Sequence, residues 1–210
     1  MTTESRRTDI LKSSPRMFDS ELLDRLSRVH PAVPVVIFLP AVSIMLAMGA
    51  ARLSALTTLG LLAAGYAVWT LSEYWIHRGV FHFEPEEGFG ARLHWIIHGV
   101  HHDHPNDPLR LVMPPGVSVP VSSLLILLFW AVIGAPYFLP FSAGFFGGYL
   151  AYDMTHYALH HHKPKTRLGR RLRELHMRHH FQDDTRGFGI SAPYWDKAFG
   201  TFPEAADKSR

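Results

Sequence analysis

The sequence of 210 residues contains no cysteine. This absence excludes disulfide bonds, thiolate metal sites and cysteine nucleophiles, so any bound metal must take nitrogen or oxygen ligands. The first thirty residues also lack the basic, apolar and small-residue order of a cleaved signal peptide. Neither an HExxH motif nor a serine-nucleophile motif is present. No recognition motif accompanies the basic residues, so we expect no nucleic-acid partner.

Charge is missing from long stretches of the chain. The run at residues 31–50 carries no charged residue, and three more apolar runs follow it. A helix needs about 20 predominantly apolar residues to cross a bilayer. We therefore expect an all-α integral membrane protein of the multi-pass type. Its four transmembrane helices are expected at about 31–50, 53–75, 116–133 and 137–155.

The segments that join these helices predict the topology. The connectors at 51–53 and 134–136 are short and nearly uncharged, whereas the basic residues concentrate near the C-terminus. By the positive-inside rule, the N-terminus and the segments 77–110 and 156–210 lie on the cytosolic side. We expect two helical hairpins with a cytosolic helical cap made of these two segments. The basic C-terminal segment would also suit lipid headgroups or an acidic partner.

The residues before the first expected span divide into two parts. Residues 1–16 are polar and lack an apolar period, which predicts a loose tail. A short helix follows, which Asp19 or Ser20 can cap and which Pro31 would end. Apolar residues recur on one of its faces, so it either lies in the membrane interface or packs on the protein.

Fifteen histidines are present, and most form four clusters that follow apolar runs. Spacings of three and four residues place imidazoles on one helix face, and imidazole is a preferred ligand of iron, zinc, copper and nickel. His77 and His82 are five apart, so they share a face only if the helix ends between them, which Gly79 would allow. Ten histidines are enough for two metals. The candidates are His77, His82, His98, His101, His102, His156, His160, His176, His179 and His180.

Residue spacing alone determines neither the identity of the metal nor the roles of the neighbouring residues. Iron would suit dioxygen chemistry, whereas zinc would suit a hydrolase or a structural site. Glu73 lies one turn before His77 and could orient a ligand histidine or simply face water. His94 could contact the site or only flank it. The sequence assigns no coordination to His104, His161 and His162.

The four clusters resemble the histidine boxes of the membrane fatty acid hydroxylase and sterol desaturase superfamily. Three further stretches are similar to its fatty acid 2-hydroxylase branch: LVMPP at 111–115, YDMTHYALHH at 152–161 and GFGISAPYWDKAFGTF at 187–202. The resemblance covers roughly residues 55–202, and we expect a hydroxylase domain over residues 31–210. Residues 1–30 would form a cytosolic tail with the interfacial helix.

The resemblance also implies the chemistry. The reaction would be a dioxygen-dependent hydroxylation at carbon 2 of a long acyl chain, either free or as the N-acyl group of a sphingolipid-like lipid. The ten histidines would ligate two metal ions on the cytosolic face, with iron expected and zinc allowed in isolated protein. Tyr152 and Asp153 match family positions near the substrate, although Asp153 could instead hydrogen-bond a ring nitrogen. Trp195 and Asp196 are expected to close the cap structurally.

The resemblance has one departure. Many members carry a haem domain that supplies electrons, and the thirty residues before the first expected span are too few for one. We therefore expect an external electron donor.

Two other functions share these features. The same histidine boxes would serve a carotenoid or sterol hydroxylase, or a desaturase. A metal transporter would also be histidine-rich and membrane-bound, but it should carry ionisable groups in the middle of its spans. The first and third expected spans have none, which argues against transport.

Overall fold

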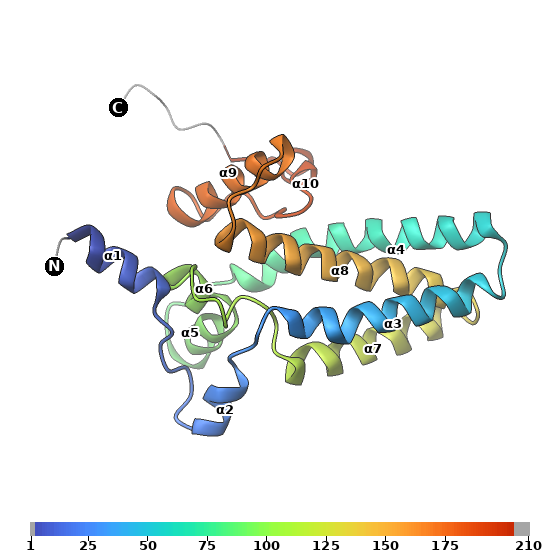
Figure 1. Cartoon of the computed structure of the whole chain (residues 1–210), viewed down its shortest axis with the longest axis horizontal. Coiled ribbons are helices and arrows are strands. Elements are labelled where there is room, and N and C mark those ends of the chain that lie inside the picture. Colours follow the sequence, from blue (N-terminus) through green and yellow to red (C-terminus); the bar gives the residue numbers. More distant parts are fainter. Residues whose placement is uncertain (1–2, 204–210) are drawn as a thin grey trace.

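The computed structural model describes residues 3–203, and within them it contains helices and no β-strand. The four apolar runs of the sequence form four long helices that lie side by side (Figure 1). They are α3 (Ala32–Ala50), α4 (Ala55–Ile76), α7 (Pro115–Ile133) and α8 (Phe138–His161). The all-α prediction is confirmed. Figure 1 also shows the shorter helices gathered at one end of this bundle, opposite the two short connectors.

Within the described residues, three helices are long and apolar enough to cross a membrane. They are α3, α7, and α4 together with its extension to Phe81. Helix α8 is as long as the others, but tyrosines, histidines and Asp153 interrupt its apolar run. It is also the most buried of the long helices, because α3 and α4 pack against it.

Glycines let α4 and α8 approach each other closely. A Cβ atom added at Gly65 of α4 would collide with the carbonyl oxygen of Phe141, and one added at Gly144 of α8 would collide with that of Leu62. The two backbones are therefore in direct contact, as small residues allow between membrane helices. Gly144 and Gly148 form a GxxxG pair in α8, and Gly148 also packs against the side chain of Trp69.

Aromatic side chains fill the rest of this contact. Phe38 of α3, Trp69 of α4 and Tyr149 of α8 belong to one buried cluster. The ring of Trp69 meets those of Phe145 and Tyr149 edge to face, each with a centroid separation of 5.3 Å. Such pairs add about 0.5–1.5 kcal/mol beyond the burial of their area. The cluster holds α3 against α4 and α8, the two helices whose ends carry histidines of the groups.

The cap consists of short elements at the end of the bundle. Helix α4 continues into a π-helical turn, η1 (His77–Phe81), before the chain leaves it. After a loop, α5 (Gly88–His94), the π-helical turn η2 (Trp95–Gly99) and α6 (Val100–Asp103) follow one another without a break. Beyond α8, the cap is completed by α9 (Arg167–Phe181) and α10 (Tyr194–Ala198).

The N-terminal residues differ from the sequence expectation. Helix α1 (Thr3–Lys12) occupies most of the segment expected to be a loose tail, so that prediction is wrong. The helix is tied to the cap, because the Asn106 amide donates to the Leu11 carbonyl at 3.0 Å and the His104 ring lies 2.7 Å from the Ile10 carbonyl oxygen. These tertiary contacts have no local sequence signal.

Helix α2 (Glu21–Leu26) forms where a short helix was expected, with Ser20 as its N-cap. It ends at Leu26, five residues before the proline that was expected to end it. The Ser27 hydroxyl donates to the Asp24 carbonyl at 2.7 Å, a local bond that competes with continued helix. The Asp24 carboxylate is held by Arg110 at 3.0 Å, which fixes α2 against the cap.

The close approach of α4 and α8 predicts that Gly65→Ala destabilises the protein. The added methyl group would push on the α8 backbone, and overpacking of this kind costs about 1–3 kcal/mol. The midpoint of thermal unfolding in detergent should therefore fall. Gly60→Ala on the same helix is the matched control, because its Cβ would meet nothing within 4 Å. An equal effect of the two substitutions would contradict the packing argument.

Candidate metal centre

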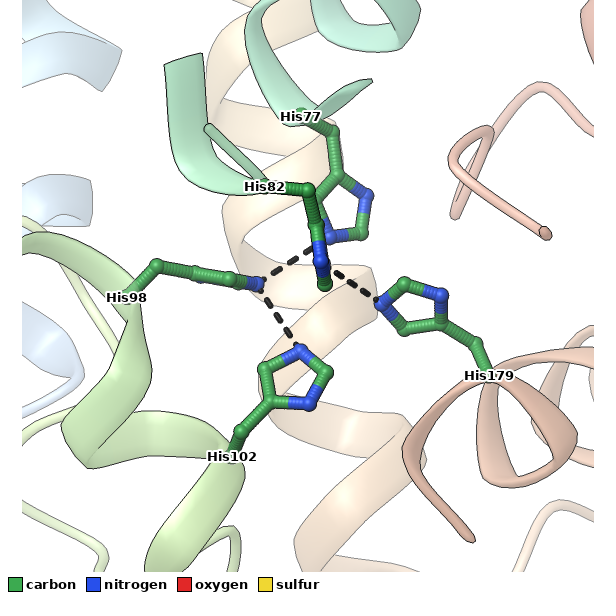
Figure 2. A group of neighbouring side chains, drawn as sticks. All are labelled: His77, His82, His98, His102 and His179. Carbon is green, nitrogen blue, oxygen red and sulfur yellow. Dashed lines mark hydrogen bonds between the residues drawn. The ribbon is translucent and has the colours of Figure 1, made fainter. Parts of the chain in front are cut away.

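The ten candidate histidines converge at the cap end of the bundle in two groups of five. Within each group, one ring nitrogen from every residue lies within 4.8 Å of the others. The first group contains His77, His82, His98, His102 and His179. The second group contains His101, His156, His160, His176 and His180. Figure 2 shows the first group, whose rings point toward a common centre from different parts of the chain.

The π-helical turn η1 brings His77 and His82 together. The amide of His82 donates to the carbonyl of His77 at 3.1 Å, which closes a five-residue turn. Five residues are about one turn of such a helix, so both rings lie on one side with centroids 5.0 Å apart. The expectation that the helix ends at Gly79 is therefore wrong, because the helix widens there instead of ending.

The two HxxHH clusters each divide their histidines between the groups. His98 and His102, four residues apart, belong to the first group, whereas His101 belongs to the second. The expectation that spacings of three and four residues place imidazoles on one helix face is therefore wrong for His101. Adjacent residues point about 100° apart on a helix, so the two members of a His-His pair face different centres.

Helix α9 repeats this division in reverse. His176 and His180 belong to the second group, and His179 reaches the first. Each cluster thus contributes to both groups, because its middle histidine belongs to a different group from the other two.

The spacing of the ring nitrogens fits a metal ion. In the first group, the Nε2 atoms of His77 and His98 are 3.2 Å apart, and those of His98 and His102 are 3.1 Å apart. In the second group, the Nε2 atoms of His101 and His156 are 3.0 Å apart. Two nitrogens bound to one metal at about 2.0–2.1 Å lie about 2.9–3.4 Å from each other. The donors present could therefore hold one ion in each group.

Hydrogen bonds on the far side of two rings support the same conclusion. The Nδ1 atom of His77 lies 2.8 Å from the Phe188 carbonyl oxygen, and that of His179 lies 2.7 Å from the Arg186 carbonyl oxygen. A carbonyl can only accept, so each Nδ1 must carry the proton. The lone pair then sits on Nε2, which faces the group.

Burial keeps the histidines of the cap neutral. It lowers the pKa of His98, His101 and His176 well below the usual value, and neighbouring histidines lower it further. The pKa of His82 falls to about 3 for the same reasons. Both ring nitrogens of His180 are buried with no hydrogen-bond partner among the described residues. Neutral rings with unshared lone pairs are the form that binds metal.

Tyr152 and Asp153 lie on α8 about one turn before the second group. The ring of Tyr152 is 5.8 Å from that of His156 between centroids, and 5.7 Å from that of Trp69. Asp153 is buried, and its hydrogen bond comes from the Tyr149 hydroxyl at 3.4 Å rather than from a ring nitrogen.

Neither interpretation of Glu73 holds. Its carboxylate is buried and accepts from the amide of Ser191 at 2.7 Å and from the Ser191 hydroxyl. It therefore neither faces water nor bonds a histidine ring, and it ties α4 to the loop before α10. The carbonyls of Phe188 and Arg186 contact ligand candidates, and sequence reasoning missed them because backbone groups leave no residue-type signal.

The remaining histidines lie outside both groups. His94 is flanking, with its Nε2 atom 3.8 Å from the Glu84 carboxylate. His104 anchors α1, and the ring of His161 packs on Tyr157 with centroids 4.3 Å apart. No metal group in the described part of the chain includes His162.

Comparison with known proteins agrees with this geometry. The family model described as fatty acid hydroxylase matches residues 62–201. A dihydroceramide fatty acyl 2-hydroxylase of Arabidopsis thaliana is 41% identical over 93% of this chain and 84% of its own length. A ceramide very long chain fatty acid hydroxylase of Saccharomyces cerevisiae is 36% identical over 91% of this chain and 50% of its own length.

A solved structure is similar as well. Full-length Scs7p, of which only the hydroxylase domain is visible, superimposes with a TM-score of 0.81 at 33% identity. The match covers 89% of this chain and 72% of that one. The sequence, the helical bundle and the two histidine groups agree, and the chain belongs to the fatty acid hydroxylase family.

Proposed function

We propose that this protein is a dioxygen-dependent membrane hydroxylase that adds a hydroxyl group at carbon 2 of a long acyl chain. The observation that carries the proposal is the pair of five-histidine groups, in a chain similar over most of its length to enzymes named 2-hydroxylases. The names of two relatives specify acyl chains of dihydroceramide and ceramide. The substrate is accordingly a free acyl chain or the N-acyl group of a sphingolipid-like lipid.

We assign one metal ion to each histidine group, with iron as the working metal and dioxygen as the co-substrate. Zinc binds the same imidazoles and could replace iron in isolated protein, but it has no redox chemistry. When bound, a redox-active metal pair supplies the oxidising power that hydroxylation of a carbon–hydrogen bond requires. The chain contributes ten neutral imidazoles and holds their orientation.

Tyr152 and Asp153 are the proposed catalytic residues beside the metal centre. Their place on α8, one turn before His156, brings them to the end of the bundle where an acyl chain between the helices would reach the histidines. The Tyr152 hydroxyl can donate to an acyl carbonyl, and the Asp153 carboxylate can accept from a substrate hydroxyl or amide. The surrounding aromatic cluster excludes water from this part of the bundle.

Helix α8 is the fourth span in this proposal. Its 24 residues reach about 36 Å at 1.5 Å per residue, more than the roughly 30 Å of a hydrocarbon core. Its polar residues are shielded from lipid by α3 and α4. Two hairpins then place the N-terminus and the histidines on one side, and the basic C-terminal segment assigns that side to the cytosol.

The domain division follows from this placement. Residues 1–30 form the cytosolic tail, with α2 lying in the interface, where Leu22, Leu23 and Leu26 are exposed. Residues 31–210 form the hydroxylase domain, with its cap at 77–110 and 156–210. Residues 1–2 and 204–210 of this division lie outside the described residues.

The reductant is an external electron donor that docks on the basic face of α9. Arg170 and Arg173 of α9, together with Lys163, line a shallow pocket of about 460 Å³ on the outer side of the cap. The inner side of the same helix carries histidines of both groups. An acidic donor docked here would lie about one helix diameter, 10–12 Å, from the metal centre.

The metal assignment predicts two ions per purified chain. His102→Ala removes a donor from the first group and His176→Ala removes one from the second, so each variant should retain a single ion. The change is measured by inductively coupled plasma mass spectrometry after dialysis against a chelator. His104→Ala is the control, because His104 lies outside both groups, and it should keep two ions. Two ions in both ligand variants would refute the assignment.

The reaction assignment predicts the product. Cells that express the protein together with an electron donor should contain acyl chains heavier by one oxygen, with the hydroxyl at carbon 2. The same chains should be absent from cells that express His102→Ala. Mass spectrometry of released acyl chains decides the matter, and chains lighter by two hydrogens would instead show a desaturase. Unchanged acyl chains in the presence of a competent donor would contradict the proposal.

The role of Tyr152 predicts that Tyr152→Phe lowers activity while metal content stays at the wild-type value. Loss of this hydrogen bond leaves a buried acyl carbonyl without a donor, which costs about 1–3 kcal/mol, so turnover should fall about fivefold to a hundredfold. Tyr157→Phe, one turn further along α8 and packed on His161, is the matched control and should retain activity. Full activity of Tyr152→Phe would remove this residue from the mechanism.

A further inference from the structure

We infer that Asp196 is a positioning residue that orients two metal-binding histidines, His77 and His179, through the loop at residues 186–191. The inference rests on the proposed function in one respect only, because it takes the first histidine group as a metal site. It gives a specific role to a carboxylate that belongs to neither group.

The loop contacts the first group through two of its backbone carbonyls. The His77 Nδ1–H donates to the Phe188 carbonyl at 2.8 Å, and the His179 Nδ1–H donates to the Arg186 carbonyl at 2.7 Å. The two histidines come from different elements, η1 and α9, yet their ring centroids are only 4.7 Å apart. A single short loop therefore sets the tautomer and the ring direction of both.

Asp196 holds this loop in place. The side chain is fully buried, and its carboxylate accepts from the amide of Phe188 at 2.9 Å and from that of Gly189 at 2.8 Å. Hydrogen bonds to a buried carboxylate are short and stronger than neutral ones. The amide that Asp196 binds and the carbonyl that His77 binds both belong to Phe188. A shift of Asp196 would therefore reorient the carbonyl that His77 contacts. A side chain at Gly189 would collide with the Ala192 carbonyl and with Asp196 itself.

A chain of hydrogen bonds connects Asp196 back to α4. The Thr201 hydroxyl lies 2.8 Å from the Asp196 carboxylate, to which it must donate, and 2.9 Å from the Tyr74 hydroxyl. A hydroxyl has one proton to donate, so the Tyr74 hydroxyl donates to Thr201. Arg78 in turn donates to the Tyr74 oxygen at 2.8 Å.

The loop is fastened to α4 at a second point. The amide of Ser191 donates to the Glu73 carboxylate at 2.7 Å. Because α4 leads directly into His77, the bonds from Tyr74 through Thr201, Asp196 and Phe188 return to the helix from which they start. The closed ring of contacts makes the position of the His77 imidazole depend on Asp196.

The support that this loop gives is confined to one histidine group. Its carbonyls contact His77 and His179, which both belong to the first group. In the second group, the Nδ1 atom of His176 and both ring nitrogens of His180 lack a hydrogen-bond partner among the described residues. Loss of Asp196 should therefore weaken the first metal site and spare the second. If Asp196 only stabilised the fold, its loss would weaken metal binding in both groups or in neither.

Asp196→Asn tests this inference on the purified, metal-loaded protein. The amide offers one oxygen where the carboxylate offers two, so its NH2 group would face a backbone N–H donor of the loop. Metal affinity of the first group should fall about tenfold to a hundredfold. After a chelator challenge that leaves two ions in the wild type, mass spectrometry of metal content should find one.

Two double variants identify the ion that is lost. In the His176→Ala background, which keeps the first site alone, Asp196→Asn should remove the remaining ion. In the His102→Ala background, which keeps the second site alone, the same change should leave the ion bound. The opposite pattern would overturn the inference, as would simultaneous release of both ions from Asp196→Asn or release at the wild-type rate.

Asp107→Asn is the matched control. Asp107 is also a buried carboxylate that accepts a backbone amide, that of Leu109 at 3.0 Å, but it has no contact with the loop. This variant should keep two ions, and circular dichroism and gel filtration should show a wild-type fold for both Asp variants. If Asp196→Asn does not fold, Thr201→Val is the alternative, because it removes one donor to the same carboxylate. In the Thr201→Val protein, the chelator should remove the ion of the first group before that of the second.

The metal count is independent of the reaction. If the variants lose metal as expected but no 2-hydroxylated chains are formed, the proposed function alone would be contradicted. A wild-type protein with fewer than two ions would contradict the dimetal centre and this inference together.

Discussion

A buried imidazole needs a hydrogen-bond partner or a metal for each ring nitrogen, because burial removes the water that would otherwise bind it. Ten buried or half-buried rings lie together at one end of the bundle, and nine of them have an Nε2 atom within hydrogen-bond distance of the Nε2 atom of another ring. Neutral rings in such a cluster cannot all find donors among themselves. An ion at each centre would relieve this deficit, and the rest of the fold keeps the rings converged.

The bundle provides that rigidity where α4 and α8 touch through their backbones. Gly65 and Gly144 leave no room for a side chain between the two helices, and the Trp69 ring packs against Gly148. The end of α4 delivers His77, and the end of α8 delivers His156 and His160. Backbone contact between these helices therefore sets the distance between the histidine groups before any cap residue contributes.

The cap then completes each group from two sides. The clusters on η2 with α6 and on α9 each contribute histidines to both groups, so each group of five draws on both clusters. The loop before α10 orients two rings of the first group through its carbonyls, while the second group lacks such partners at His176 and His180. The two sites are consequently unequal in their support, although they have the same number of histidines.

The sequence alone determined the all-helical fold, the apolar runs and the ten candidate histidines. Apolar runs and spacings of three or four residues are local patterns, and helix geometry converts them directly into structure. The family assignment also followed from these motifs. The helix at Thr3–Lys12 was missed, since its anchoring contacts with the cap are remote in sequence.

Only the tertiary structure decided how the histidines divide, how His77 and His82 come to share a side, and what Glu73 and Asp196 contact. Residue spacing gives the direction of a side chain around its own helix axis. It does not say which helix lies opposite, whether a turn widens to a π-helix, or which backbone carbonyl faces a ring. Those outcomes depend on packing between segments more than a hundred residues apart, such as Glu73 with Ser191 and His77 with Phe188.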